Sequence, residues 1–98
     1  MRVGVDLIEI ERAYCDSKPN PAQHYAGRFA AKEAVGKAIG SGVHFTWREI
    51  EIHGRPKPGV RLSGRTAAFA RRVGAGRIEV SMTHSRELAA AVAVVVPA

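Results

Sequence analysis

The connections between the predicted elements are short, and this restricts the fold more than any other feature of the sequence. Residues 77–84, RIEVSMTH, alternate between apolar and polar side chains, and three residues separate them from the apolar run LAAAVAVVV at 88–96. Alternation and β-branched content of this kind are typical of strands. Because a parallel pair needs a crossover of a dozen or more residues, we expect these two strands to form an antiparallel hairpin.

Periodicity and turn residues predict five strands and two helices. Asn20 and Ser63 stand where each helix needs a capping residue, and Gly40 follows the first helix where a left-handed cap is expected. We therefore expect one α+β domain over residues 1–98, with a largely antiparallel sheet packed against a long central helix. The expected elements are a strand at 2–10, a helix from 21 to Gly40, strands at 45–53 and 60–63, a helix at 66–73 and strands at 77–84 and 88–96.

Alternation also assigns the faces of the strands. In the first strand, Val3, Val5 and Leu7 share one face, and Asp6 points to the other. The last strand is apolar throughout, which predicts burial on both of its faces. In the preceding strand, the residues expected to point inward are Ile78, Val80 and Met82.

Composition excludes several classes of protein. Apolar residues make up 46% of the 98 residues and charged residues 24%, which is ordinary globular usage and excludes a disordered chain. No apolar run reaches the roughly 18 residues of a membrane span, and the N-terminus does not resemble a secretory signal, so we expect a cytoplasmic protein that does not enter a membrane. A single cysteine, Cys15, excludes an internal disulfide framework and a thiolate metal cage within one chain. The net charge of +6 indicates a negatively charged partner without identifying it.

The stretch RFAAKEAVGKAIG, residues 28–40, places an acid and a base four residues apart on the first helix. Glu33 and Lys37 could form a surface ion pair, which contributes only a few tenths of a kcal/mol. On a helical wheel, however, they fall on the same side as Ala26, Phe29 and Ala30. This position favours a partly buried polar site that faces another charge. The opposite side of the helix is not wholly polar, since it carries Val35 and Ile39.

Two carboxylates on rigid elements would suit a hard divalent cation. Asp6 comes from a strand and Glu33 from a helix. Magnesium takes one or two protein carboxylates and completes its shell with water and substrate phosphates. Nearby lysine or arginine side chains would then hold those phosphates. The spacing alone makes this a weak indication, because any small domain offers two acids.

Four segments together resemble the holo-[acyl-carrier-protein] synthases, the small 4′-phosphopantetheinyl transferases. They follow the family's order and cover most of the chain, and the first two are the most specific. The resemblance implies the 4′-phosphopantetheinyl transferase fold and a homotrimer with sites between adjacent subunits. The segments are GVDLIEIER at 4–12, RFAAKEAVGKAIG at 28–40, RLSG at 61–64 and VSMTHSRELAAAVAVV at 80–95.

The resemblance also implies an activity and roles for single residues. The activity is magnesium-dependent transfer of 4′-phosphopantetheine from coenzyme A to a serine of acyl carrier protein in fatty acid biosynthesis, with release of adenosine 3′,5′-bisphosphate. By position, Asp6 and Glu33 match the metal-binding acids. Lys37 matches the lysine near the coenzyme A phosphates, and with Glu33 it would carry the catalysis. Arg12 matches an arginine that docks the acidic carrier protein. The positions that match the lining of the coenzyme A site are Arg28, Gly40, Ser63 and His84.

One departure from the family pattern lies between the first two segments. Family members usually carry a longer helical stretch there, whereas only residues 13–27 intervene here. More than twenty residues of the family pattern are missing just after Arg12, either because this member is naturally shorter or because the sequence omits a stretch. Two other interpretations of the function stay open. A basic domain of this size could bind nucleic acid, although exposed aromatics are needed and aromatic content is only 6%. A non-catalytic oligomeric scaffold domain is the other. His24, His44 and His53 are expected to be structural.

Overall fold

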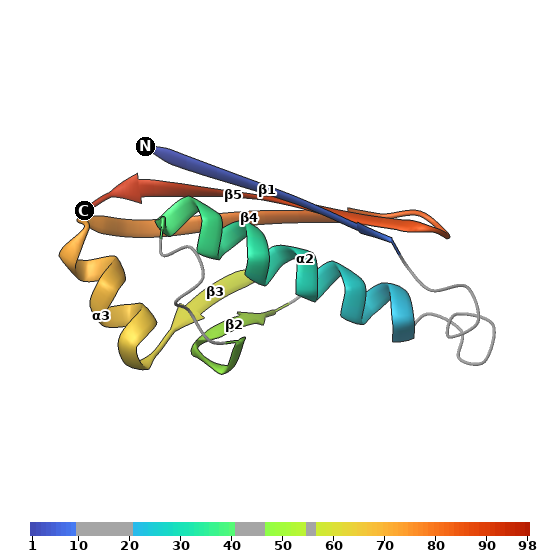
Figure 1. Ribbon diagram of the computed structural model, residues 1–98, viewed down its shortest axis with the longest axis horizontal. Coiled ribbons are helices and arrows are strands. Elements are labelled where there is room, and N and C mark those ends of the chain that lie inside the picture. The colour runs from blue at the N-terminus through green and yellow to red at the C-terminus, as the bar shows by residue number, and fades with distance from the viewer. Residues whose placement is uncertain (10–20, 41–46, 55–56) are drawn as a thin grey trace.

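A computed structural model describes residues 1–9, 21–40, 47–54 and 57–98 of the chain. The elements follow one another in the predicted order (Figure 1). None of the helices within these residues is long and apolar enough to cross a membrane. The elements are β1 (Arg2–Glu9), α2 (Pro21–Ile39), η2 (Trp47–Glu49), β2 (Ile50–His53), β3 (Gly59–Leu62), α3 (Gly64–Arg72), β4 (Ala75–His84) and β5 (Leu88–Pro97).

The five strands form two sheets rather than one. A three-stranded sheet has the order β1-β5-β4, and β2 pairs with β3 in a separate two-stranded sheet. All of these pairings are antiparallel, as predicted. Helix α2 lies between the two sheets (Figure 1). The sequence could not separate the two sheets, because alternation within a strand does not identify its neighbours.

The contact between α2 and the three-stranded sheet is made of very small residues. On β1, a Cβ added to Gly4 would lie 2.1 Å from the carbonyl oxygen of Ala34 and 2.7 Å from the amide nitrogen of Ala38. The strand and the helix therefore approach each other to backbone contact, which only glycine permits. The alanines buried on either side of this contact are Ala30, Ala31, Ala34, Ala38, Ala89, Ala91 and Ala93.

The predicted faces of α2 are wrong in part. Ala30 is buried as expected, but Phe29, assigned to the same side, is 43% exposed. Val35 and Ile39, the apolar residues expected on the opposite side, are fully buried, in agreement with a helix that packs on both sides. Phe29 was assigned wrongly because alanines occur all round the helix, so the sequence pattern hardly distinguishes one side from another. Glu33 and Lys37 consequently lie at the edge of the buried face rather than within it.

Among the residues that the structure describes, the three-stranded sheet is covered on one face only. Its inner face packs on α2, and Val80 of β4 is 6% exposed, as its predicted inward position requires, with Ile78 and Met82 packed against the same core. The prediction that β5 is buried on both faces is wrong, because Leu88 and Val92 point away from the helix and are 42% and 37% exposed. We call this uncovered surface the outer sheet face. Its large apolar residues are Val3, Val5, Leu7, Leu88 and Val92.

The strand predicted at 45–53 is shorter in the structure. Residues 47–49 form the 3₁₀ turn η2, and β2 covers only Ile50–His53, while Phe45 lies outside the described residues. The turn brings the Glu49 carboxylate to the start of α3, where it accepts hydrogen bonds from the amides of Arg65 and Thr66 at 3.3 and 3.0 Å. Ser63 occupies the capping position, but its side chain makes no capping hydrogen bond. Glu49 thus caps α3 in its place. Asn20, the cap predicted for α2, lies outside the described residues.

Candidate functional site

Asp6 and Lys37 meet where β1 crosses α2. The ammonium of Lys37 lies 2.9 Å from Oδ1 of Asp6 and also donates to the carbonyl oxygen of Val5 at 3.1 Å. The Asp6 side chain is 12% exposed, whereas that of Lys37 is 53% exposed. The lysine therefore covers a nearly buried carboxylate from the solvent side. Asp6 lies on the helix-facing side of β1, opposite Val5 and Leu7, as predicted.

The second oxygen of this carboxylate is unsatisfied. Oδ2 of Asp6 is buried and has no hydrogen-bond partner among the described residues. Burying a carboxylate oxygen without a donor or a cation is costly, and native structures rarely leave one in that condition. The ammonium of Lys37 contacts only Oδ1 of this carboxylate and leaves Oδ2 without a partner among the described residues. The geometry around Asp6 therefore fits a second positive ligand, and a carboxylate oxygen is the donor that a hard cation such as Mg²⁺ prefers.

Glu33 lies one helical turn before Lys37 and on the same side of α2. It is half-buried, and its carboxylate forms no ion pair with any described residue. The simple surface pair between Glu33 and Lys37 is therefore not formed, because Lys37 turns to Asp6 instead. No group of three histidine, cysteine, aspartate or glutamate side chains comes together in the described ranges. A cation here would depend on one or two carboxylates plus water and substrate oxygens.

The other predicted site residues lie on separate elements. Arg28 donates a hydrogen bond to the carbonyl oxygen of Ile52 and so ties α2 to β2. Gly40 has a φ of +89° directly after α2, as its predicted capping role requires. Ser63 is exposed at the start of α3, and His84 is exposed at the end of β4. The structure does not bring these four into one cluster, and Arg12 lies outside the described residues.

Two tertiary contacts at helix ends have no signal in the sequence. The guanidinium of Arg2 donates to the carbonyl oxygen of Ile39 at 2.8 Å, which satisfies the C-terminal end of α2 from a strand 37 residues away. The carboxylate of Glu49 also accepts the hydroxyl of Thr66 at 2.7 Å. This hydrogen bond is the main cause that lowers the pKa of Glu49 below its ordinary value, followed by the bond from the Thr66 amide. Contacts between residues so far apart follow from the tertiary fold, so no local pattern could reveal them.

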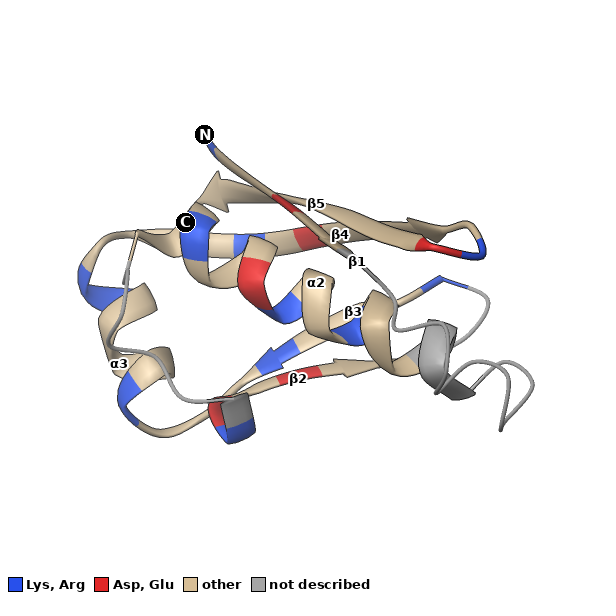
Figure 2. Cartoon of the chain, turned by 45° about the vertical axis from the view of Figure 1, so that its right-hand side comes forward, with Lys and Arg blue, Asp and Glu red and all other residues tan. Residues whose placement is uncertain are grey.

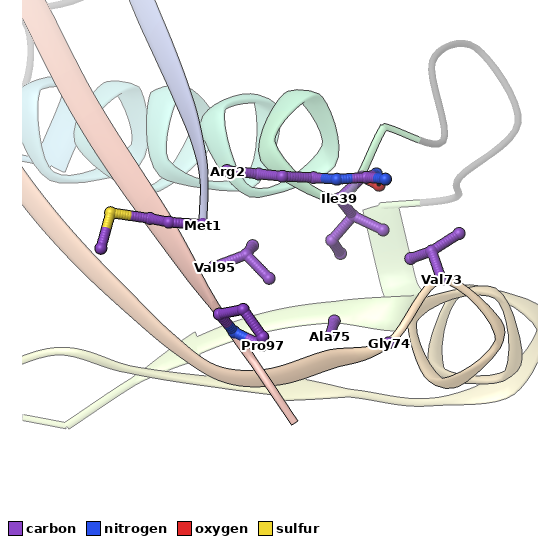
Figure 3. Close-up of a pocket in the computed structure, with 8 residues that line it drawn as sticks. All are labelled: Met1, Arg2, Ile39, Val73, Gly74, Ala75, Val95 and Pro97. Atoms are coloured by element: carbon purple, nitrogen blue, oxygen red, sulfur yellow. Dashed lines mark hydrogen bonds between the residues drawn. The ribbon is translucent and has the colours of Figure 1, made fainter.

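A small cavity lies beside the C-terminal end of α2, and neither Asp6 nor Lys37 lines it. Figure 3 shows its walls, which come from both chain ends and from the turn before β4. Its volume is about 80 Å³, far below the roughly 300 Å³ or more of a typical ligand pocket. The candidate site is therefore the crossing of β1 and α2. The cavity is lined by Met1, Arg2, Ile39, Val73, Gly74, Ala75, Val95 and Pro97.

Comparison with known sequences identifies the family of the chain. The family model of the 4′-phosphopantetheinyl transferase superfamily matches residues 6–93. The holo-[acyl-carrier-protein] synthase of Moorella thermoacetica is 39% identical over 121 aligned residues, covering 97% of this chain and 93% of that protein. That of Clostridium acetobutylicum is 40% identical over 116, covering 94% of each. Both alignments exceed the 98 residues of the chain, so these relatives carry residues that it lacks. The predicted shortening after Arg12 falls outside the described residues and stays a prediction.

Solved structures confirm the predicted fold. The acyl carrier protein synthase of Mycobacterium tuberculosis superimposes with a TM-score of 0.74 at 34% identity, over 99% of this chain and 97% of that one. The holo-[acyl-carrier-protein] synthase of Helicobacter pylori, in complex with coenzyme A, gives 0.75 at 24% identity, over 96% and 99%. The α+β arrangement with antiparallel strands is thus the one that these enzymes share.

Proposed function

This chain belongs to the 4′-phosphopantetheinyl transferase superfamily, as a member of its holo-[acyl-carrier-protein] synthases, and we propose the following reaction for it. The serine hydroxyl of an apo acyl carrier protein attacks the β-phosphorus of coenzyme A. A new oxygen–phosphorus bond joins phosphopantetheine to the serine, and the bond to the α-phosphate breaks. Adenosine 3′,5′-bisphosphate leaves, and the serine loses its proton. The negative carrier and the phosphates of coenzyme A together account for a chain with a net charge of +6.

The observation that carries this proposal is the carboxylate of Asp6, paired on one oxygen and unsatisfied on the other. Asp6 and Glu33 would hold Mg²⁺, which supplies positive charge against the diphosphate when it is bound. Lys37, whose ammonium is half-exposed beside Asp6, would turn to the phosphate on which negative charge develops. A fixed ammonium would stabilise this developing negative charge better than mobile water does. Electrostatic stabilisation of this kind is usually the largest contribution to lowering a reaction barrier.

The serine proton needs an acceptor near the same site. Glu33 is half-buried and has no ion-pair partner among the described residues, and we propose that it orients a water that takes the proton. A carboxylate that also holds a cation is a poorer base, which favours the water as the direct acceptor. Arg28, Gly40, Ser63 and His84 would line the rest of the coenzyme A site, and Arg12 would contact the carrier.

We also propose a homotrimer. The outer sheet face exposes apolar side chains on neighbouring strands, with Val3, Val5 and Leu7 between 57% and 62% exposed. A contiguous apolar surface of this kind on a small domain is typical of an interface between protein chains. A trimer through this face would cover it and would strengthen a domain too small to bury much surface alone. The proposed location is the cytoplasm, and the proposed pathway is fatty acid biosynthesis.

A direct test is to incubate the protein with coenzyme A, Mg²⁺ and apo acyl carrier proteins of several kinds, and to weigh each carrier by mass spectrometry. We expect a gain of one phosphopantetheine group, which requires Mg²⁺. Asp6→Asn and Glu33→Gln should each abolish the gain while the circular dichroism spectrum stays that of the unmodified protein. No gain with any carrier would refute the proposed transfer, and full activity of both variants would refute the metal assignment.

A further inference from the structure

Helix α3 presents a strongly basic face to solvent. Arg65, Arg71 and Arg72 are all exposed, whereas Thr66 and Ala70, on the other side, are buried. The helix sequence GRTAAFARR contains no acidic residue. Figure 2 shows the resulting blue segments along α3 and no red segment on it. We call the exposed surface of Arg65, Arg71 and Arg72 the α3 basic face.

Helix stability explains only part of this arrangement. Arg71 and Arg72 lie in the last turn, where a positive charge interacts favourably with the helix dipole. Arg65 lies in the first turn, where the dipole disfavours a cation and an acid would be expected instead. A charge that opposes local stability is better explained by an interaction with another molecule.

The charges on this face are only partly compensated by the described residues of the chain, because the carboxylate of Glu49 lies near Arg65 and attracts its charge. The nearest acid, Glu49, uses its carboxylate to accept the amides of Arg65 and Thr66 and the hydroxyl of Thr66. Arg72 lies over the ring of Phe69, 5.6 Å from its centre, which leaves its charge in place. None of the three arginines forms an ion pair within the part of the chain that the structure describes.

Two other exposed arginines of the protein differ in this respect. Arg61 pairs with Glu51 at 3.0 Å, and Arg77 pairs with Glu79 at 3.1 Å. The exposed Arg48 and Arg86 form no ion pair among the described residues either, so unpaired arginines are not confined to α3, but α3 carries more of them than any other described element. This concentration favours a specific acidic partner over general solubility.

We propose that the α3 basic face docks the acidic acyl carrier protein, an inference that rests on the proposed function. At 1.5 Å per residue, Arg65 and Arg72 lie about 10 Å apart along the helix axis. A single phosphate cannot span that distance. A row of carboxylates on the surface of an acidic protein can match it, with exposed charge pairs setting the rate and the salt dependence of association.

The position of α3 in the fold agrees with this partner. Helix α3 lies below α2 in Figure 1, whereas the three-stranded sheet lies above it. Assembly through the outer sheet face would thus leave the α3 basic face accessible. A second copy of this chain is a poor occupant, because it would bring arginines against arginines.

The test compares two double variants that each remove two positive charges. Arg65→Gln/Arg71→Gln alters the α3 basic face, and Arg61→Gln/Arg77→Gln is the matched control elsewhere on the surface. Binding of fluorescently labelled apo acyl carrier protein, without coenzyme A, is followed by anisotropy at several salt concentrations. We expect about tenfold weaker binding and a shallower salt dependence for the α3 variant, and less than a twofold change for the control.

Further measurements on the same variants distinguish a loss of carrier docking from a loss of coenzyme A binding, of catalysis or of folding. The KM for coenzyme A and the turnover at saturating carrier should stay unchanged in the α3 variant, and both variants should keep the thermal unfolding temperature of the parent. Equal carrier binding by both variants would overturn the proposal, as would a change confined to coenzyme A or to a single-stranded RNA probe. If the parent binds the carrier through α3 but transfers nothing, the docking surface stands and the proposed transfer fails.

Discussion

Gly4→Ala should destabilise the protein strongly, although it adds only one methyl group. The new Cβ would lie 2.1 Å from the carbonyl oxygen of Ala34 and 2.7 Å from the amide nitrogen of Ala38, where ordinary contact begins near 3.4 Å. Both obstacles are backbone atoms of α2, so no side-chain rotation can relieve the overlap. Strand β1 would have to move away from the helix by about 1 Å. Overpacking usually costs about 1–3 kcal/mol, and we expect about 3 kcal/mol here.

The chain offers a matched control for this substitution. Gly27 is also buried and also faces the sheet, but a Cβ there would meet only the sulfur of Met82, at an ordinary 3.8 Å. Because Gly27 lies inside α2, Gly27→Ala should gain roughly 0.5–1 kcal/mol of helix stability. The same chemical change is thus expected to have opposite signs at two glycines of one interface.

Urea unfolding followed by circular dichroism measures both variants, at one protein concentration because assembly would make stability depend on it. For a domain of this size, about 3 kcal/mol corresponds to a fall of roughly 12–24 °C in the unfolding temperature. Gly4→Ala should also reduce transfer activity, since Asp6 follows two residues later on the displaced strand. A Gly4→Ala protein within about 0.5 kcal/mol of the parent would refute the backbone contact and the reasoning built on it.

Three further predictions follow from contacts described above. Glu49→Gln should lower the unfolding temperature and flatten the acid side of the stability profile. The bond from Thr66 lowers the pKa of Glu49, so its contribution is complete above the unfolded pKa of about 4.3 and is lost as the pH falls through the lower folded value; an equally steep loss below about pH 5 in the variant would contradict this. Lys37→Met should weaken coenzyme A binding in calorimetry without weakening Mg²⁺ binding, because it frees Oδ1 of Asp6; unchanged coenzyme A affinity would exclude a phosphate role. Val5→Glu should dissociate the proposed trimer in light scattering, whereas the exposed substitution Arg61→Gln should not, and a monomeric parent would remove the interface from consideration.

Local patterns predicted the elements of this fold well. The inward positions of Ile78, Val80 and Met82 follow from strict alternation, and α2 stops where Gly40 takes a left-handed conformation. Burial in a strand leaves a period-two signature that neighbouring residues reveal by themselves. The burial of Phe29 on α2 was mispredicted because a helix rich in alanine has no such signature, since small residues fit a buried side and an exposed side equally well.

The sequence predicted which residues belong to the candidate site, but not the contacts between them. Asp6 and Lys37 are 31 residues apart, and their contact depends on how β1 crosses α2. Glu49 and Thr66 are 17 apart, and their hydrogen bond depends on the η2 turn. The family resemblance supplied the first pair as candidates, but it assigned them to different ligands and did not predict that they touch. Glu49 had no motif at all, because an acid that caps a helix from a distant turn looks like any surface acid.

The alanine-lined contact between α2 and the sheet also limits how this protein can change. In most cores a side chain that grows can be accommodated by a neighbour that shrinks, but Gly4, Ala34 and Ala38 have almost nothing left to remove. Almost every substitution at these positions therefore adds side-chain volume. A second substitution at the same contact cannot make room for the first. Attempts to stabilise the enzyme by redesigning its interior should leave this crossing intact and start from the larger apolar residues around Ile39 and Ile50, where volume can still be exchanged.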